Sequence, residues 1–211
     1  MIEYENEPIP GLPGLPPKGE YILWRGSPQW RLLARSAFHT RLIAGYFGLL
    51  AAYATVCAVR GSGTLTGVAL TLGTGVTGLV LLHALAWASA RSTIYTLTNR
   101  RIVLRVGIAV PKCINLPLTA ITSADLAVGV GGAGDIALTL SGSPKLGYLT
   151  LWPHARAWRL ARPVPMMRCV PNGEQVAKLV ARTCRNANPN VLTGVPTAAV
   201  RSPRALEEAA A

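Results

Sequence analysis

Acidic side chains are scarce in this sequence. Its 211 residues include 21 Lys and Arg but only nine Asp and Glu, which gives a formal net charge of +12 at pH 7. Between Trp24 and Leu206 the only acids are Asp125, Asp135 and Glu174, and they lie far apart in the sequence. Most hydrolytic and metal-dependent reactions need carboxylates as acids, bases or ligands. We therefore expect no catalytic constellation, and the chain is not predicted to be an enzyme.

Cysteine is also sparse. The four cysteines, which show no paired spacing, are Cys57, Cys113, Cys169 and Cys184. This pattern predicts neither a disulfide framework nor a metal site, and it is typical of a reducing compartment. We expect no cleavable signal peptide, because the N-terminal residues are acidic and proline-rich instead of basic and then apolar.

Long apolar runs are what the sequence does have. Leu42–Val59 is 18 residues long without a charge, and Thr64–Ala90 is 27 residues long with His83 as its only ionisable side chain. As helices they would measure roughly 27 and 40 Å, against about 30 Å for a bilayer's hydrocarbon core. We predict a transmembrane helical hairpin with a tight loop at residues 60–63. The alternative is a pair of buried helices in a soluble bundle.

Positive charge flanks these runs. The arginines on the two outer sides are Arg25, Arg31, Arg35 and Arg41, then Arg91, Arg100, Arg101 and Arg105. The connecting loop has Arg60 alone, so the positive-inside rule predicts a multi-pass membrane protein with both termini in the cytoplasm. A basic chain often binds nucleic acid, but here the charge would face anionic lipid headgroups. Candidate membrane-surface residues are Arg31, Arg35, Arg100 and Arg101.

Four regions follow from composition and periodicity. Residues 1–26 form a proline-rich arm, which is either a docking peptide or an ordinary flexible N-terminus. Residues 27–91 hold the two spans, preceded by a segment that begins at Ser27-Pro28 with apolar residues at helical spacing. That segment is either an interfacial amphipathic helix or the first turns of a longer transmembrane helix. Residues 92–186 form a cytoplasmic β domain, and residues 187–211 have no periodicity and read as a disordered tail.

The β domain is predicted from alternation of period two. A hairpin is expected over residues 92–107, and further strands near residues 113–118, 123–128, 135–140, 145–151 and 166–170. A helix follows from Asn172, with Gln175 placed as in a capping box. The fold class is therefore α+β: a membrane hairpin, then a small antiparallel sandwich or partly open barrel with a C-terminal helix. By analogy, this is the layout of a pleckstrin-homology-like domain.

Residues 129–134 match the glycine pattern of dinucleotide-binding proteins. That motif must open a helix whose N-terminus holds pyrophosphate. Here the next residues, Asp135–Leu140, alternate like a strand. We therefore interpret the glycines as a hairpin loop.

The predicted spans carry two candidate features. Gly63, Gly67, Thr71 and Gly75 are spaced four apart, and such small-residue rows let helices pack closely in lipid. Either the two spans pack only on each other, or one row receives a partner's helix. A second copy of the chain is a separate candidate partner. His83 is a candidate ligand for the magnesium of bacteriochlorophyll. The alternative is that His83 is hydrogen-bonded to the other helix or lies near the membrane interface.

The segment around Trp152–Pro163 is rich in tryptophan and arginine, the residue types enriched at binding hot spots. Candidate contacts to a client protein or to lipid are Trp152, His154, Arg156, Trp158, Arg159 and Arg162. The alternative is a loop whose tryptophans cover the core of the β domain.

Several short stretches resemble one family. Tyr95–Val103 (YTLTNRRIV) resembles bacterial pleckstrin-homology-like membrane proteins. The remaining stretches narrow this to the PuhB family, whose members are photosynthetic-complex assembly proteins of purple bacteria. These stretches are PIPGLP (8–13), GEYILW (19–24), GIA (107–109), NLP (115–117), GDI (134–136) and LWPHAR (151–156). The resemblance covers roughly residues 3–185.

The resemblance implies a non-enzymatic factor of the photosynthetic membrane that helps assemble the reaction centre with its core light-harvesting 1 ring. Its partners would be core light-harvesting and reaction-centre polypeptides together with anionic lipids, with no required cofactor. Two alternatives stay open. One is a protein that binds bacteriochlorophyll or anionic lipid, and the other is a generic envelope protein with a bacterial pleckstrin-homology domain.

Overall fold

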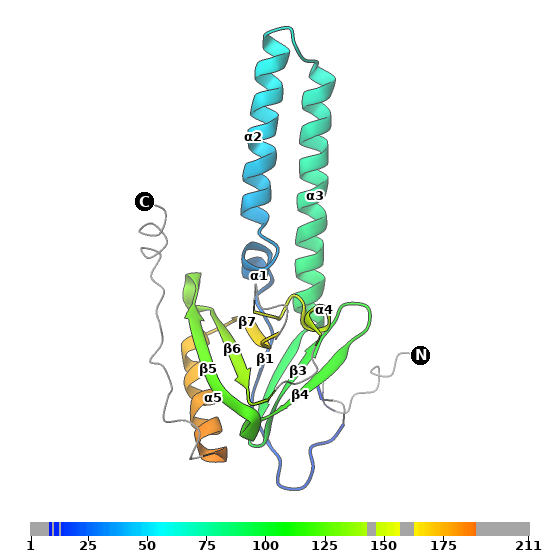
Figure 1. Ribbon diagram of the computed structural model, residues 1–211. Coiled ribbons are helices and arrows are strands. Elements are labelled where there is room, and N and C mark those ends of the chain that lie inside the picture. The colour runs from blue at the N-terminus through cyan, green and yellow to red at the C-terminus, as the bar shows by residue number, and fades with distance from the viewer. Residues whose placement is uncertain (1–8, 10, 13, 143–146, 157–162, 189–211) are drawn as a thin grey trace, which may run out of the picture. The chain divides into compact units, whose positions relative to one another are not determined.

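A computed structural model describes residues 9, 11–12, 14–142, 147–156 and 163–188 (Figure 1). The chain divides into two compact units. The helical unit is residues 30–88, and the β unit combines residues 1–29 with residues 89–211. The β unit is therefore assembled from segments on both sides of the helical unit in the sequence.

The helical unit contains three helices: α1 (Trp30–Ser36), α2 (Thr40–Val59) and α3 (Leu65–Ser92). His39 adopts a left-handed backbone conformation with φ of 49°, which ends the path of α1 before α2 begins. The segment before the first apolar run is thus a separate short helix and not the first turns of α2. Between α2 and α3 the chain turns at Gly61, whose φ of 77° favours glycine.

α2 and α3 are each long and apolar enough to cross a membrane, with mean hydropathies of 1.9 and 1.8. Only 6% of the most apolar 18-residue window of each helix is buried within the structure. Neither helix is therefore a buried core helix within the part of the chain that the structure describes. Their apolar side chains need cover from lipid or from another protein.

The β unit contains two antiparallel sheets. The first has the order β1-β2-β3-β4, and the second has the order β5-β6-β7. Their strands are β1 (Ile22–Gly26), β2 (Ile94–Thr98), β3 (Arg101–Val106), β4 (Lys112–Pro117), β5 (Ile121–Val128), β6 (Gly134–Leu140) and β7 (Met166–Val170). In β2, Tyr95 and Leu97 face the core, whereas Ile94 faces the other side, where Gly11 of the N-terminal segment packs against it. The alternation that predicted the hairpin thus separates the two faces of this sheet.

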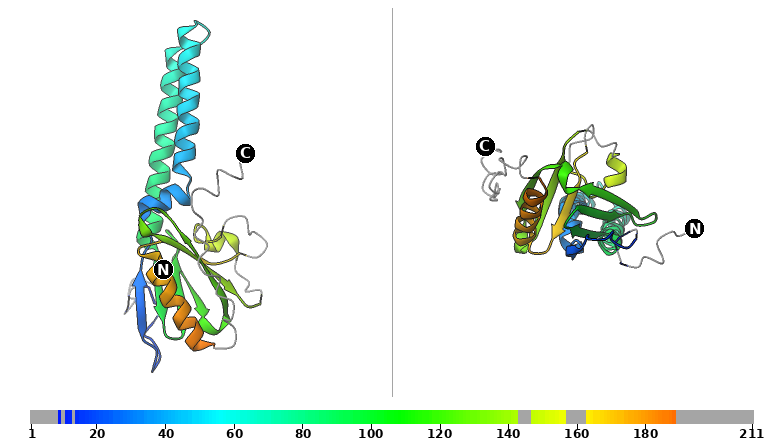
Figure 2. Two further views of the ribbon diagram at one scale, coloured as in Figure 1. Left: turned by 90° about the vertical axis from the view of Figure 1, so that its left-hand side faces the viewer. Right: turned by 90° about the horizontal axis from the view of Figure 1, so that it is seen from below.

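Helix α5 (Gly173–Ala187) closes the core of the β unit. It packs on β5, β6 and β7 and buries Val176, Val180 and Cys184 (Figure 2). The 3₁₀ turns η1 (Leu118–Ala120) and η2 (Val130–Gly132) join β4 to β5 and β5 to β6. Gly129, Gly131 and Gly132 therefore lie in the loop of the β5–β6 hairpin, which confirms the predicted hairpin loop, and Gly134 begins β6.

Three details of the predicted β domain are wrong. Tyr148–Leu151 forms a short helix, α4, where a strand was expected over residues 145–151; residues 143–146 lie outside the described part of the chain. The proline-rich arm does not extend to residue 26, because Ile22–Gly26 pair with β2 as a strand. Asn172 has a left-handed backbone and no side-chain capping bond, so the capping box does not form.

Candidate functional site

The two long helices pack on each other at one glycine of the predicted row. A Cβ atom added to Gly75 of α3 would lie 2.9 Å from Cβ of Phe47 in α2. Gly63 lies in the loop against Cys57 and Ala58, and the Thr71 hydroxyl donates a hydrogen bond to the carbonyl of Gly67 at 2.9 Å within its own helix. Of the two alternatives for this row, packing inside the hairpin is what the structure has at Gly75.

A different face of α3 is open. It forms a groove of about 500 Å³, the α3 groove, whose lining residues are Ala69, Leu70, Gly73, Thr74, Thr77, Gly78 and Leu81. A Cβ atom at Gly73 or Gly78 would meet nothing within 4 Å. Residues 69, 73 and 77 form a second row spaced by four. It is distinct from the predicted row through Gly75. This second row is the small-residue surface that α2 leaves uncovered.

His83 is exposed on α3, and its Nδ1 lies 2.8 Å from the carbonyl oxygen of Leu79. A carbonyl can only accept, so Nδ1 carries the proton and Nε2 keeps its lone pair. This tautomer presents Nε2 as a ligand for a metal centre. If a chlorin bound here, Nε2 of His83 would be the atom to hold its magnesium.

The predicted contact segment divides between surface and core. Trp152 is 47% exposed, and the Arg156 guanidinium lies 3.2 Å from Oδ2 of Asp125 in a half-exposed ion pair. His154, by contrast, is fully buried. A surface role for His154 is therefore wrong. Trp158, Arg159 and Arg162 lie outside the described residues.

His154 belongs to a buried chain of hydrogen bonds, the His154 relay. The backbone N–H of Arg168 donates to Tyr95 Oη at 3.1 Å, and Tyr95 Oη lies 2.7 Å from His154 Nδ1. The phenol then donates to Nδ1, which leaves Nε2 to donate to Thr93 Oγ1 at 3.0 Å. Burial, reinforced by the charge of Arg168, lowers the pKa of His154 to about 3, and burial raises the pKa of Tyr95. The relay joins Thr93, directly after α3, to β7 through neutral groups.

The predicted membrane-surface arginines also differ from one another. Arg31 and Arg35 are exposed on α1, and the Arg31 guanidinium lies 5.4 Å from the ring centroid of Trp30. Arg100 lies in the turn between β2 and β3, and Arg101 is the first residue of β3. Arg101 also donates to both carboxylate oxygens of Glu20, at 2.8 and 3.0 Å. Its charge is therefore used within the β unit.

Within the described part of the chain, no group of three or more His, Cys, Asp or Glu side chains is arranged to hold a metal ion. The four cysteines are free thiols, and Cys169 and Cys184 are buried.

Comparison with known proteins gives three matches. Residues 42–183 match the family model described as "Bacterial PH domain". Over 190 residues the chain is 38% identical to a *Rhodobacter capsulatus* protein named "Uncharacterized 23.7 kDa protein in puhA 5'region", a match that covers 87% of this chain and 88% of that protein. A solved structure of a DUF1696-family protein with a pleckstrin-homology domain, from *Shewanella loihica*, is 17% identical with a TM-score of 0.29, over 44% of this chain and 70% of that one. The family match includes α2, α3 and most of α5.

Proposed function

The chain belongs to the bacterial PH domain family, and we propose that it is a non-enzymatic membrane assembly factor for the photosynthetic reaction centre–light-harvesting 1 core complex. In this proposal, α2 and α3 span the inner membrane with both termini in the cytoplasm. The arginine distribution supports this orientation, because Arg60 is the only basic residue between the two helices. Arg31 and Arg35 are placed to contact anionic headgroups.

The observation that carries the proposal is the α3 groove. Five of its seven lining residues are Ala, Gly or Thr and the other two are Leu. It lies away from the Gly75 contact with α2, and nothing within the helical unit fills it. In lipid, close approach of helix backbones is a principal source of helix association, because burial of apolar surface contributes little there. A transmembrane helix of a client polypeptide is the occupant that this groove suits.

The class of client comes from the resemblance of residues 3–185 to the PuhB family. The gene region in the name of the *Rhodobacter capsulatus* relative, puhA, supports the same setting. The clients proposed are therefore core light-harvesting and reaction-centre polypeptides.

Filling the α3 groove should abolish client capture. With Gly73→Leu and Gly78→Leu combined, we expect the amount of co-purified light-harvesting or reaction-centre polypeptide to fall at least about five-fold, because the leucines hold the helices apart. The measurement is quantitative mass spectrometry of complexes purified from detergent-solubilised membranes. The matched control is Gly45→Leu on α2, where a Cβ atom also meets nothing within 4 Å. Equal capture by the double variant and the wild type would contradict the proposal.

The geometry of His83 favours pigment binding as a second candidate function. If Nε2 ligates bacteriochlorophyll, adding the pigment to the purified protein should produce a shifted near-infrared band, and His83→Leu should remove most of it. Ala84→Leu, at the neighbouring exposed position, is the control for pigment that merely partitions into detergent. A spectrum identical for wild type and His83→Leu would eliminate this candidate.

A further inference from the structure

Strand β1 lies at the edge of its sheet. Among the described strands it pairs only with β2, through Trp24 with Leu97, Arg25 with Thr96 and Gly26 with Tyr95. In an antiparallel pair only alternate residues direct their N–H and C=O groups toward the neighbour. The other backbone groups of β1 therefore point to its free edge, and such an edge can accept a further strand.

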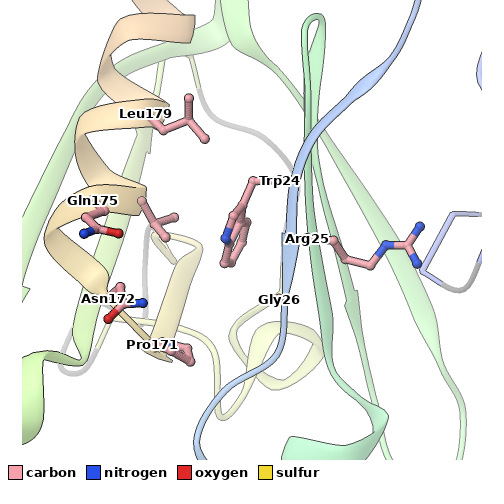
Figure 3. A pocket seen from close by; sticks show the side chains of 8 residues that line it. Trp24, Arg25, Gly26, Pro171, Asn172, Gln175 and Leu179 are labelled. Atoms are coloured by element: carbon pink, nitrogen blue, oxygen red, sulfur yellow. The ribbon is translucent and has the colours of Figure 1, made fainter.

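A groove of about 340 Å³, the β1–α5 groove, lies between this edge and helix α5. Figure 3 shows the Trp24 indole reaching across it toward α5, with Gln175 and Leu179 on the opposite wall. The indole lies over Gly26, because a Cβ atom there would come within 2.7 Å of ring atom Cη2. Glycine at position 26 thus lets the ring lie flat along β1 and keeps the groove open.

The lining combines an apolar floor with amide groups. Val176 is buried and Leu179 is half-buried, and both come from α5. The side-chain amides of Asn172 and Gln175 and the Trp24 Nε1–H form no hydrogen bond with any residue that the structure describes. An apolar floor, free amides and a strand edge together match the chemistry of a polypeptide backbone that carries an apolar side chain.

The charge around the groove is positive. Arg25 is the only charged residue of its lining, with its guanidinium directed away from the cavity. Arg182 is exposed and lies on the same side of α5 as Gln175, because residues seven apart stack on one helix face. The nearby Glu174 is paired with Lys178 at 2.6 Å. An occupant with carboxylate side chains is therefore favoured.

We propose that the β1–α5 groove binds an extended, acidic segment of another polypeptide, which adds to β1 as a further strand. Its backbone bonds to the free edge of β1, and one apolar side chain packs on Val176 and Leu179. On the opposite face of the added strand its carboxylates lie toward Arg25. The inference is independent of the α3 groove and of His83, so its test can fail while the proposed function holds, and the proposed function can fail while this inference holds.

The test uses the full chain in detergent micelles and a fluorescein-labelled heptapeptide of alternating glutamate and valine, with binding followed by fluorescence anisotropy. Gln175→Trp, at an exposed position, fills the groove and should weaken binding at least about ten-fold. Arg25→Glu should weaken binding about five-fold. Arg185→Glu makes the same charge change at an exposed position of α5 outside the groove lining, so binding should change less than about two-fold.

Two further probes separate strand addition from attraction between opposite charges. A heptapeptide N-methylated at alternate residues keeps its charge but cannot complete the ladder, so it should not bind. A heptapeptide with lysine in place of glutamate should not bind either. The proposal is overturned if the wild type shows no saturable binding, if Gln175→Trp binds normally, if Arg25→Glu and Arg185→Glu behave alike, or if the methylated peptide binds as well as its parent.

Discussion

Replacing Gly173 by alanine is expected to lower the free energy of unfolding of the β unit by about 3 kcal/mol. Gly173 is the first residue of α5 and is buried against β6. An added Cβ atom would collide with Cα and N of Gly134 and would lie 3.2 Å from the carbonyl carbon of Ala133. These atoms are backbone, so no side chain can rotate away to make room. The start of α5 would have to move off the sheet and expose part of the core around Val176.

The measurement is the urea dependence of Cys184 labelling by a thiol reagent in the full chain in micelles. Cys184 is 1% exposed on the core side of α5, and burial raises its pKa to about 11, so it reacts only when the β unit opens. Gly129→Ala is the control, because its Cβ atom would make an ordinary contact of 3.4 Å with the Ala133 carbonyl. If Gly173→Ala and Gly129→Ala unfold at the same urea concentration, the close approach of Gly173 to the Gly134 backbone does not limit the packing of α5.

Most of the fold could be predicted because its signals are local. The apolar lengths of α2 and α3 and the alternation in β2 and β3 need no knowledge of distant residues. β1 was not predicted for two reasons. Its partner, β2, follows only after the whole helical unit. Its five residues come after a proline-rich stretch and are too few to show a clear alternation on their own. Residues 148–151 were mistaken for a strand because a short run rich in apolar residues does not distinguish a strand from a helical turn.

The candidate sites were harder to predict because burial and neighbours are tertiary properties. The sequence shows that α3 is rich in small residues. Only the position of Phe47 distinguishes the face of α3 that packs on α2 from the face that stays open. The β1–α5 groove joins residues about 150 positions apart in the sequence, so nothing near Trp24 indicates it. His154 was interpreted as a surface contact because it stands among exposed residue types, whereas Tyr95, 59 residues earlier, holds it inside the core.

His154→Phe is expected to destabilise the β unit by about 2 kcal/mol at pH 7, because it leaves the Tyr95 hydroxyl buried without its acceptor. The phenylalanine ring replaces most of the volume of the imidazole, so the loss reflects the hydrogen bonds of the relay more than a cavity. Thr93 loses its partner at the same time. Cys184 labelling in urea, as above, measures the change, and Tyr95→Phe, which removes the same bond from the other side, should give a loss of similar size.

The same substitution should also abolish a pH dependence of stability. In the unfolded chain His154 binds a proton below its ordinary pKa of 6.5, whereas in the folded chain it does so only below about 3. Between these values the unfolded state holds more protons, so stability falls as the pH falls, by about 1.4 kcal/mol per pH unit.

The comparison is cleanest between pH 6.5 and pH 5, above the range in which Glu20 titrates. Burial opposes ionisation of Glu20, but its hydrogen bonds with Arg101 and Thr98 hold its pKa below the ordinary 4.5. Over this range the wild type should lose about 2 kcal/mol that His154→Phe does not lose, so the two proteins should be about equally stable near pH 5. His83→Phe, outside the β unit, should keep the wild-type slope. A His154→Phe protein that also keeps that slope would show that His154 is not held neutral in the core, and the relay would then have to run through a charged imidazolium.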